Sequence, residues 1–405
     1  MRNQSLVTYS MKPKKLLRRE FIDLSALGVL GLSSSAPLFA SELIAPSPRE
    51  LFLHIGTYTS GRSEGIYVYR FNLSSGEFRH LATAKGIIDP SFLAIDPQRR
   101  HLYAVNEIDQ FGGKPGGAVS AFRVDPKTGN LQFLNQQPSL GGAPCHLSVD
   151  KSGKFLLVAN YGGGNASVLP LHDNGLGMPV DMVQHGGSSV NPERQKGPHA
   201  HNVILDKANR HAFVTDLGLD KIMIYRFDAR SGKLTANDAP WAKLKPGSGP
   251  RHFTFHPNGR WAYVINELNS TLTAFNYESA SGRLKERQTV STLPAGFSGE
   301  NSCADVHVSP SGKFLYGSNR GHDSIVVFSI NAGTGKLTFV EHVSTGGKTP
   351  RNFTIDPSGA FLLAANQKSD NVVSFRIDAT SGRLKPTGHV AEVPTPVCLV
   401  LSGKL

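Results

Sequence analysis

The sequence predicts an all-β protein, a seven-bladed β-propeller with four antiparallel strands in each blade. Two internal repeats and their spacing support this prediction. A turn followed by a strand-like run recurs six times at steps of 47 to 56 residues, and a second turn recurs seven times between these copies. No run of comparable length has helical periodicity. A period of this length with four strands in each unit is typical of propeller blades.

The first repeat is a β-hairpin. Its clearest copy is GPRHFTFHPNGRWAYVINELNST at 249–271, where aromatic and β-branched runs flank a His-Pro-Asn-Gly-Arg turn. Pro and Asn-Gly favour the turn, and the flanking residues favour strands. Arg251 and Glu267 lie about equally far from the turn, so we expect them to meet at the open end of the hairpin. The copies of the turn begin at Asp96, Asp150, Asp206, His256, Ser309 and Asp356.

The second repeat is a polar turn that ends in Gly-x-Leu or a close variant. An alternating run of β-branched and aromatic residues precedes each copy, as at 119–124 and 372–377. Alternation with a period of two residues indicates a strand with one buried face. The seven turn glycines are Gly76, Gly129, Gly175, Gly232, Gly282, Gly335 and Gly382.

The two ends of the chain are predicted to complete the seventh blade. The run at 51–55 matches a second strand but has no first strand before it, and the run at 394–401 matches a first strand with no partner after it. We therefore expect the two runs to pair, which closes the ring and removes the exposed edges of an open array. A two-sheet β-sandwich array is the alternative, but it does not require so regular a period.

The composition is that of a folded protein with a basic surface. The chain has 405 residues, of which 39% are hydrophobic and 18% charged, and a formal net charge of +12. This balance favours an anionic small molecule as partner, whereas no basic stripe with interleaved aromatic residues predicts nucleic-acid binding. The three cysteines, Cys145, Cys303 and Cys398, have neither disulfide nor zinc-site spacing, and small buried residues are the expected interpretation. We expect a monomer without metal or cofactor.

Residues 1–40 are predicted to be an export signal and residues 41–405 a single propeller domain. A basic patch precedes an apolar run at 24–32, which is followed by small residues and Ala40. This layout is typical of secretory signals, and Arg18-Arg19 resembles the twin-arginine signal. We therefore expect a periplasmic protein; a basic tail without a targeting role is the alternative. The run is too short for a stable membrane anchor, and no later stretch is apolar enough to be one.

One rim of the predicted ring carries many charged and imidazole side chains. The open ends of the first hairpins face this rim, so the same two positions in each blade surround one opening. The starts of the first strands supply Ser91, Cys145, His201, Arg251 and Arg351, with Asp305 nearby, and the ends of the second strands supply Glu107, Tyr161, Asp216, Glu267, Arg320 and Gln367-Lys368. Half-buried charges are costly unless they are paired. The set therefore predicts a binding site for an anionic ligand.

Several of these residues also have purely structural interpretations. Arg251 and Glu267 could join neighbouring strands as an ion pair, and Asp216 could cap a turn. His199 and His201 are two residues apart, so strand alternation places at most one of them in the channel, and register favours His201. His-x-His could also bind a metal ion, but no third ligand is evident in the sequence.

The segment at 249–271 is specific enough to indicate a family. Together with GPHAHNV at 197–203, ADVHVSPSGKFLYGSNR at 304–320 and PRNFTIDPSGAFLLAANQKS at 350–369, it closely resembles the propeller-type 6-phosphogluconolactonases, whose relatives include other lactonases and muconate cycloisomerases. The resemblance implies a seven-bladed fold that opens or closes cyclic esters of sugar acids or muconates. By motif position it implies Arg251, Glu267 and Arg320 as site residues, with His201 or His199 as the histidine.

We expect hydrolysis of a sugar-acid lactone. A carbonyl attacked by water develops negative charge, which a guanidinium stabilises in a site with little water. Arg251 and Arg320 are therefore the predicted anchors, and Glu267 or the histidine the predicted general base. The predicted substrate contacts are Arg351, Asp305, Asp216 and Glu107.

The sequence leaves the identity of the lactone open. The resemblance implies 6-phospho-D-glucono-1,5-lactone, but an exported protein would not meet this cytosolic metabolite, so a non-phosphorylated aldonolactone is the other expectation. Two further classes compete with lactone hydrolysis. One is a non-catalytic propeller that binds an anionic ligand or a protein, and the other is a lactone-forming cycloisomerase.

Overall fold

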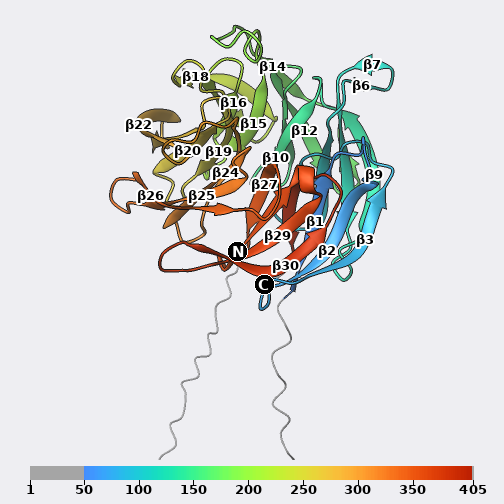
Figure 1. Ribbon diagram of the computed structural model, residues 1–405. Coiled ribbons are helices and arrows are strands. Elements are labelled where there is room, and N and C mark those ends of the chain that lie inside the picture. The colour runs from blue at the N-terminus through green and yellow to red at the C-terminus, as the bar shows by residue number, and fades with distance from the viewer. Residues whose placement is uncertain (1–49, 404–405) are drawn as a thin grey trace, which may run out of the picture. The chain divides into compact units, whose positions relative to one another are not determined.

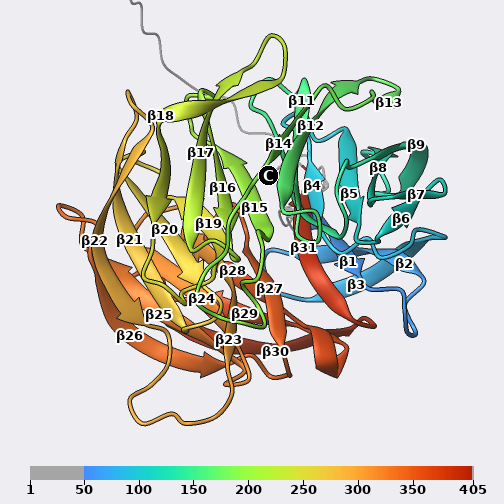
Figure 2. The same cartoon turned by 90° about the horizontal axis from the view of Figure 1, so that it is seen from above.

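The computed structural model describes residues 50–403. These residues form seven antiparallel sheets around one axis, as two perpendicular views show (Figures 1 and 2). We number the sheets blades 1 to 7 in chain order. The predicted seven-bladed propeller is confirmed, and within residues 50–403 the single helical element is the short turn η1 (Gln367–Ser369).

The first three blades contain the closing seam and the irregular parts of the ring. From the axis outward, blade 1 consists of β31 (Pro396–Ser402), β1 (Glu50–Thr57), β2 (Gly65–Asn72) and β3 (Phe78–Lys85), and blade 2 of β4 (Leu93–Ile95), β5 (His101–Asn106), β8 (Ala118–Val124) and β9 (Leu131–Pro138). Blade 3 consists of β10 (Pro144–Val149), β11 (Phe155–Asn160), β12 (Asn165–His172), β13 (Gly175–Leu176) and β14 (Asp181–Gln184). A small hairpin of β6 (Gln110–Phe111) and β7 (Lys114–Pro115) extends from blade 2.

The other four blades each have four consecutive strands. Blade 4 consists of β15 (Ala200–Leu205), β16 (His211–Asp216), β17 (Lys221–Asp228) and β18 (Lys233–Lys243), and blade 5 of β19 (Pro250–Phe255), β20 (Trp261–Asn266), β21 (Thr271–Glu278) and β22 (Arg283–Ser291). Blade 6 consists of β23 (Ser302–Val308), β24 (Phe314–Arg320), β25 (Ser324–Ile330) and β26 (Leu337–Ser344), and blade 7 of β27 (Pro350–Ile355), β28 (Phe361–Asn366), β29 (Asn371–Ile377) and β30 (Leu384–Glu392).

The ring closes in blade 1, as predicted. Strand β1 pairs with β2 on its outer side and with β31 on its inner side, from Phe52↔Ser402 to Gly56↔Cys398. His54 lies across this seam, and its Nε2 is 3.0 Å from the hydroxyl oxygen of Ser402. In Figure 2 the red strand β31 accordingly lies beside the blue strand β1. Closure of this kind leaves no inner edge strand without a partner.

The second strands of the blades form the apolar centre of each sheet. All six residues of β5, β11, β16, β20 and β28 are buried. Each of these strands is covered on both faces by neighbouring blades, so its sequence is almost continuously apolar rather than alternating.

A carboxylate holds most of the turns that precede these second strands. In blade 3, Oδ1 of Asp150 accepts hydrogen bonds from the backbone N–H groups of Lys154 and Phe155, at 2.7 and 2.8 Å. In blade 4, Oδ1 of Asp206 accepts from the N–H groups of Arg210 and His211. This bonding explains why aspartate recurs at the start of the repeat, since its side chain satisfies the turn's free N–H groups.

The glycines of the second repeat join one blade to the next. Six of them have φ between 70° and 85°, and a Cβ at any of them would lie 2.4 to 2.9 Å from an aromatic ring at or near the start of the second strand of the preceding blade. Only glycine combines this backbone conformation with so close a contact. The pairs are Gly76–Phe361, Gly129–Phe52, Gly232–Phe155, Gly282–His211, Gly335–Trp261 and Gly382–Phe314.

Blade 3 departs from this pattern. Gly175 has φ 125° and lies against Asn135 instead of an aromatic ring. Strand β12 pairs with β14 near its start and with β13 at its end, so the outer edge of this blade is split between two short strands. The prediction of four strands per blade therefore holds with one local irregularity.

The predicted export signal at residues 1–40 lies outside the described residues. Within the part of the chain that the structure describes, no helix has the length and apolar character needed to cross a membrane.

Candidate active site

The mouth of the channel is built from β-bulges. At the start of the inner strand in blades 3, 4, 5 and 7, one residue falls in a register shift between its neighbours. A bulge leaves its residue unpaired and turns the side chain away from the regular alternation of the strand. The repeated bulge thus presents side chains of four blades at one end of the channel. The four bulged residues are Cys145, His201, Arg251 and Arg351.

A polar cavity of about 320 Å³ lies at this mouth. Its size falls within the range of small-molecule sites. Arg251 is almost completely buried and pairs with Glu267, which lines the cavity. The cavity is lined by Glu107, Cys145, Tyr161, Arg194, His201, Glu267, Ser302, Arg320 and Arg351.

Glu267 is the centre of an arginine cluster on one side of the mouth. Its Oε2 lies 2.9 Å from Nη2 of Arg320 and 3.0 Å from Nε of Arg251, and its Oε1 accepts a hydrogen bond of 2.7 Å from Nη2 of Arg194. The Nε–H of Arg251 is not aligned on Oε2, so that contact is an ion pair rather than a hydrogen bond. Burial opposes ionisation of Glu267, but Arg320, Arg251 and Arg194 outweigh it and lower its pKa to about 2.

The arginines of this cluster are also fixed by the backbone. Nη1 of Arg251 donates to the carbonyl oxygen of Ala304 at 2.7 Å, and Nη2 of Arg320 donates to that of Cys303 at 2.8 Å. Burial, together with repulsion from Arg320 and Arg351, lowers the pKa of Arg251 to about 10, so its guanidinium remains charged at neutral pH. Both guanidinium groups are therefore held in place before any ligand binds.

A second network lies on the other side of the mouth. Glu107 accepts hydrogen bonds on Oε2 from the hydroxyl of Tyr58, at 2.8 Å, and from the hydroxyl of Ser91. Arg351 donates from Nη2 to the Tyr58 oxygen at 2.8 Å, and its guanidinium lies 5.4 Å from the centre of the Tyr58 ring. Burial, together with Glu107, raises the pKa of Tyr58, although Arg351 acts in the opposite sense, so the hydroxyl stays protonated and can donate.

His201 and Cys145 lie between the two networks, and both are neutral. Burial, reinforced by Arg251, His252 and Arg351, holds the pKa of His201 well below its usual range. Burial also raises the pKa of the Cys145 thiol, whose Sγ is 3.7 Å from Nδ1 of His201. A protonated thiol is a poor nucleophile, so the geometry supports the interpretation of Cys145 as a small buried residue.

The mouth carries an excess of positive charge. Four guanidinium groups (Arg194, Arg251, Arg320 and Arg351) face two carboxylates (Glu107 and Glu267), which leaves a formal charge of +2. A concave site of one sign attracts small ions of the opposite sign. Within residues 50–403, no group of three or more His, Cys, Asp or Glu side chains has a geometry suited to a metal ion.

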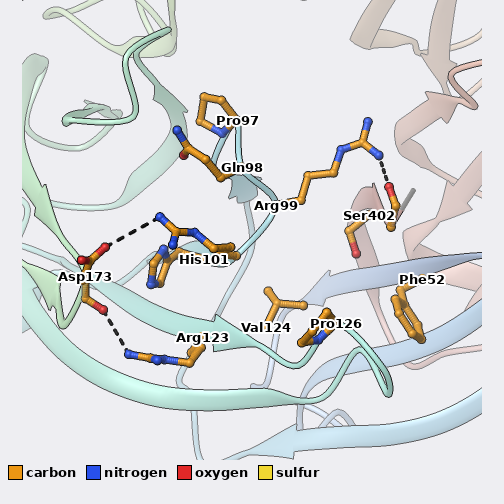
Figure 3. A pocket seen from close by; sticks show the side chains of 12 residues that line it. Phe52, Pro97, Gln98, Arg99, His101, Arg123, Val124, Pro126, Asp173 and Ser402 are labelled. Carbon is orange, nitrogen blue, oxygen red and sulfur yellow. Dashed lines mark hydrogen bonds and ion pairs between the residues drawn. The ribbon is translucent and has the colours of Figure 1, made fainter. Parts of the chain in front are cut away.

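A larger cavity of about 1030 Å³ lies elsewhere, at the closed end of the first hairpin of blade 2 (Figure 3). It is lined by Phe52, Arg99, His101, Arg123 and Asp173 among others, and Arg123 donates to the backbone carbonyl of Asp173. His101 begins the second strand of blade 2, where the other blades have a ring covered by a turn glycine. The turn glycine of blade 3, Gly175, lies against Asn135 instead of this ring, and the cavity lies beside it. The larger cavity is therefore a packing irregularity, and the smaller polar cavity is the better candidate for chemistry.

Comparison with known proteins identifies the family. The family model described as "Lactonase, 7-bladed beta-propeller" matches residues 52–401. The chain belongs to this lactonase family. The 6-phosphogluconolactonase of Bacillus subtilis is 38% identical over 301 residues, which cover 74% of this chain and 83% of that protein. The 6-phosphogluconolactonase of Formosa agariphila is 39% identical over 308 residues, which cover 75% and 86% respectively.

A solved structure of a lactonase has the same fold as this chain. The periplasmic gluconolactonase of Pseudomonas aeruginosa is 37% identical, with a TM-score of 0.82 over 87% of this chain and 99% of that one. The resemblance inferred from the segment at 249–271 is thus confirmed at the level of family and fold.

The lactonase mouth brings together six of the nine residues that the sequence singled out. Arg251 and Glu267 meet at the open end of their hairpin, as expected. Of the two histidines, His201 lines the cavity, whereas His199 stacks on the ring of Tyr161 at 4.4 Å and lies outside the cavity lining. The six are Glu107, His201, Arg251, Glu267, Arg320 and Arg351.

The structure places two of the predicted substrate contacts, Asp216 and Asp305, outside the cavity lining. Oδ2 of Asp216 is 2.6 Å from Nδ1 of His185, and its Oδ1 accepts from the N–H groups of His199 and Leu219, so this buried carboxylate holds a loop. Asp305 also lies outside the cavity lining. In blade 6 the bulge contains Ala304 and Asp305 together, and Ala304 takes the register position of Arg251.

Asp305 belongs to a second layer of side chains below the mouth. Its Oδ1 lies 2.7 Å from Nδ1 of His252, and its Oδ2 lies 3.0 Å from Nε2 of His307 and accepts from Asn352 at 2.6 Å. Burial opposes its ionisation, but His307 and His252 hold its pKa well below the usual range. Oδ1 also accepts from the backbone N–H of Val306, and Oδ2 from that of Phe353, so both oxygens are fully used inside the protein.

Reasoning from the repeats missed three residues of the lactonase mouth, which are Ser302, Arg194 and Tyr58. Arg194 lies in the connection between β14 and β15, and Tyr58 follows β1. Neither occupies a repeated strand position, so no register argument could place it. Arg194 is held because its neighbour Gln195 is completely buried and donates to the carbonyl oxygen of Leu217.

Proposed function

We propose that the protein hydrolyses the lactone of a sugar acid. The observation that carries this proposal is the cavity at the bulged ends of the inner strands, where four guanidinium groups and two carboxylates lie together and three of the guanidinium groups pair with Glu267. Membership of the lactonase family and the names of the relatives, 6-phosphogluconolactonase and gluconolactonase, support the same activity.

The arginines supply the electrostatic part of the reaction. When water adds to the carbonyl carbon of a lactone, the carbonyl oxygen acquires negative charge. Arg320 and Arg351 line the cavity and are placed to stabilise this oxygen or the carboxylate of the product. Arg251 lies behind them and holds Glu267, which in turn orients Arg320. Because these groups are fixed in advance, little reorganisation accompanies the formation of the charge.

We propose a non-phosphorylated aldonolactone as the primary substrate. The twin-arginine-like sequence at Arg18-Arg19 supports export, and the Pseudomonas aeruginosa relative is named a periplasmic gluconolactonase. A periplasmic site for this protein follows as part of the same proposal. Fractionation of cells that carry the double substitution Arg18→Lys and Arg19→Lys tests it, because retention of periplasmic delivery would contradict the twin-arginine route.

The activity is tested by titrating the acid released from glucono-1,5-lactone, and from its 6-phosphate, in a pH-stat. We expect the protein to accelerate the first reaction well above the buffer rate, and the variant Arg320→Gln to lose most of this acceleration. Glu77→Gln, which changes an exposed carboxylate in a turn of blade 1, is the matched control and should behave like the natural protein. Buffer-level rates with both lactones would favour a non-catalytic propeller, and formation of lactone from the open acid would favour a cycloisomerase.

A further inference from the structure

The two carboxylates at the mouth are in different electrostatic states. Glu267 uses both oxygens, since Oε1 is bonded to Arg194 and Oε2 lies against Arg251 and Arg320. A carboxylate that neutralises three guanidinium groups holds a proton only in strong acid, and its pKa is about 2. A general base must bind the proton it removes. Glu267 is therefore poorly suited to the role of general base that the sequence allowed for it. It holds Arg194, Arg251 and Arg320 in position instead.

Glu107 is different because one of its oxygens is free. Its Oε2 accepts from Tyr58 and Ser91, whereas its Oε1 accepts no hydrogen bond from the described residues. Oε1 is not one of the buried side-chain atoms without a partner, which means that it is in contact with solvent. Because Glu107 lines the cavity, this oxygen is accessible to a water molecule inside the site.

The surroundings of Glu107 orient the carboxylate without neutralising it. Its Oε2 is held by two neutral hydroxyl groups, those of Tyr58 and Ser91. The nearest cation of this network, Arg351, donates to the Tyr58 oxygen and makes no hydrogen bond or ion pair with Glu107. Its guanidinium has further N–H groups with no partner among the described residues. A carboxylate with a fixed direction and a free oxygen therefore lies beside a cation with free donors.

We propose that Glu107 is the general base of the hydrolysis, and this inference rests on the lactonase activity proposed above. Oε1 takes a proton from a water molecule as its oxygen bonds to the lactone carbonyl carbon, and the carbonyl electron pair moves to the oxygen that the arginines stabilise. When the tetrahedral intermediate collapses, the bond between the carbonyl carbon and the ring oxygen breaks. The proton held by Glu107 passes to the ring oxygen, which leaves as a hydroxyl group. One water is consumed, the carboxylate is regenerated, and no other reactant is needed.

His201 is the competing candidate, and its geometry is less suitable. Its Nδ1 lies 3.7 Å from the sulfur of Cys145, so Nε2 is the ring nitrogen left for a ligand in the cavity. The ring packs edge-on against Tyr161 and His252, with centroid distances of 5.5 and 5.4 Å. Next to the bulged arginines such a ring stays neutral, and a weakly basic imidazole contributes more by shape and hydrogen bonding than by accepting a proton.

The inference is tested by substituting each candidate base in the full chain and measuring kcat and KM for glucono-1,5-lactone. Glu107→Gln should lower kcat roughly 100- to 10,000-fold, the usual contribution of a general base, with KM nearly unchanged. His201→Asn should lower kcat less than tenfold. Glu107→Ala should regain activity when formate is added, because a small carboxylate can occupy the space of the missing group, whereas Glu267→Ala should not. Circular dichroism and the thermal midpoint establish that each variant is folded.

The outcomes separate the two proposals. If the natural protein accelerates hydrolysis but Glu107→Gln retains more than a tenth of its kcat, Glu107 is not the base and the lactonase proposal stands. A larger loss in His201→Asn than in Glu107→Gln, or formate rescue of Glu267→Ala alone, would also transfer the role to the other residue. If the natural protein accelerates no lactone hydrolysis, both proposals are overturned together.

Discussion

Replacing Glu267 by glutamine tests whether this carboxylate is the electrostatic centre of the mouth. The substitution keeps the shape and one acceptor oxygen but removes the charge that three guanidinium groups share. The side chains of Glu267 and Arg251 are only 6% and 3% exposed, and that of Arg320 is 12% exposed, so water can compensate little. Arg194, at 41% exposure, can be solvated and adds little to the cost.

Two estimates of the stability lost in Glu267→Gln agree. The pKa of Glu267 falls from 4.5 to about 2 in the folded protein, which corresponds to roughly 3 kcal/mol of stability at neutral pH. Removal of one partner from a buried ion pair typically costs about 3 to 5 kcal/mol. Because backbone carbonyls also hold Arg251 and Arg320, we expect the lower figure, about 3 kcal/mol.

Chemical denaturation at pH 7 and at lower pH measures this effect. The folded pKa is depressed, so the contribution of Glu267 is complete above pH 4.5 and disappears as the pH falls from 4.5 to about 2. The free energy of unfolding of Glu267→Gln should therefore be about 3 kcal/mol below that of the natural protein at pH 7, with a smaller difference near pH 3. A difference at pH 7 no larger than that of the control Glu77→Gln would refute the role assigned to Glu267.

Three further predictions follow from the same geometry. Gly335→Ala should destabilise the fold by about 1 to 3 kcal/mol more than Gly259→Ala in thermal unfolding, since both have φ near 70° but a Cβ at position 335 would lie 2.5 Å from the ring of Trp261 and one at 259 would meet nothing within 4 Å; equal losses would contradict the interblade contact. Burial raises the pKa of all three thiols, so iodoacetamide at pH 7 should label none of them in the folded protein as judged by mass spectrometry, and rapid labelling would show that they are accessible. Arg194→Ala should raise KM several-fold with a small change in kcat, because this arginine is the most exposed of the cluster and lies at the border of the cavity. A selective loss of kcat would instead assign Arg194 to the chemical step.

The fold could be predicted from the sequence because each blade repeats the same pattern of turns and strands. A turn that begins with Asp or its equivalent, an apolar second strand and a turn glycine recur with a nearly constant period, so seven copies reinforce one another. The register of these repeats also placed Arg251 opposite Glu267 and favoured His201 over His199. The split outer edge of blade 3 could not be predicted in this way, because Gly175 keeps the motif while its backbone and its contact differ.

The differences between the predicted and the observed lining of the mouth have physical causes. In blade 6 the register position belongs to Ala304, and Asp305 was expected at the mouth only as a charge next to it. Counting along a repeat does not show that the bulge contains both residues, and Asp305 lies one layer below the mouth. Arg194 and Tyr58 come from connections between repeats, where no periodic signal exists. The roles of Glu107 and Glu267 depend on how many donors reach each oxygen, and this information appears only when distant blades are placed together.

A crystal structure with bound aldonic acid, the product of the proposed reaction, tests the central claim most directly. The account predicts the product in the cavity of about 320 Å³, with its carboxylate within hydrogen-bond distance of Arg320 or Arg351 and of Oε1 of Glu107. Product bound instead in the cavity beside Arg99 and His101, with the mouth empty, would contradict it.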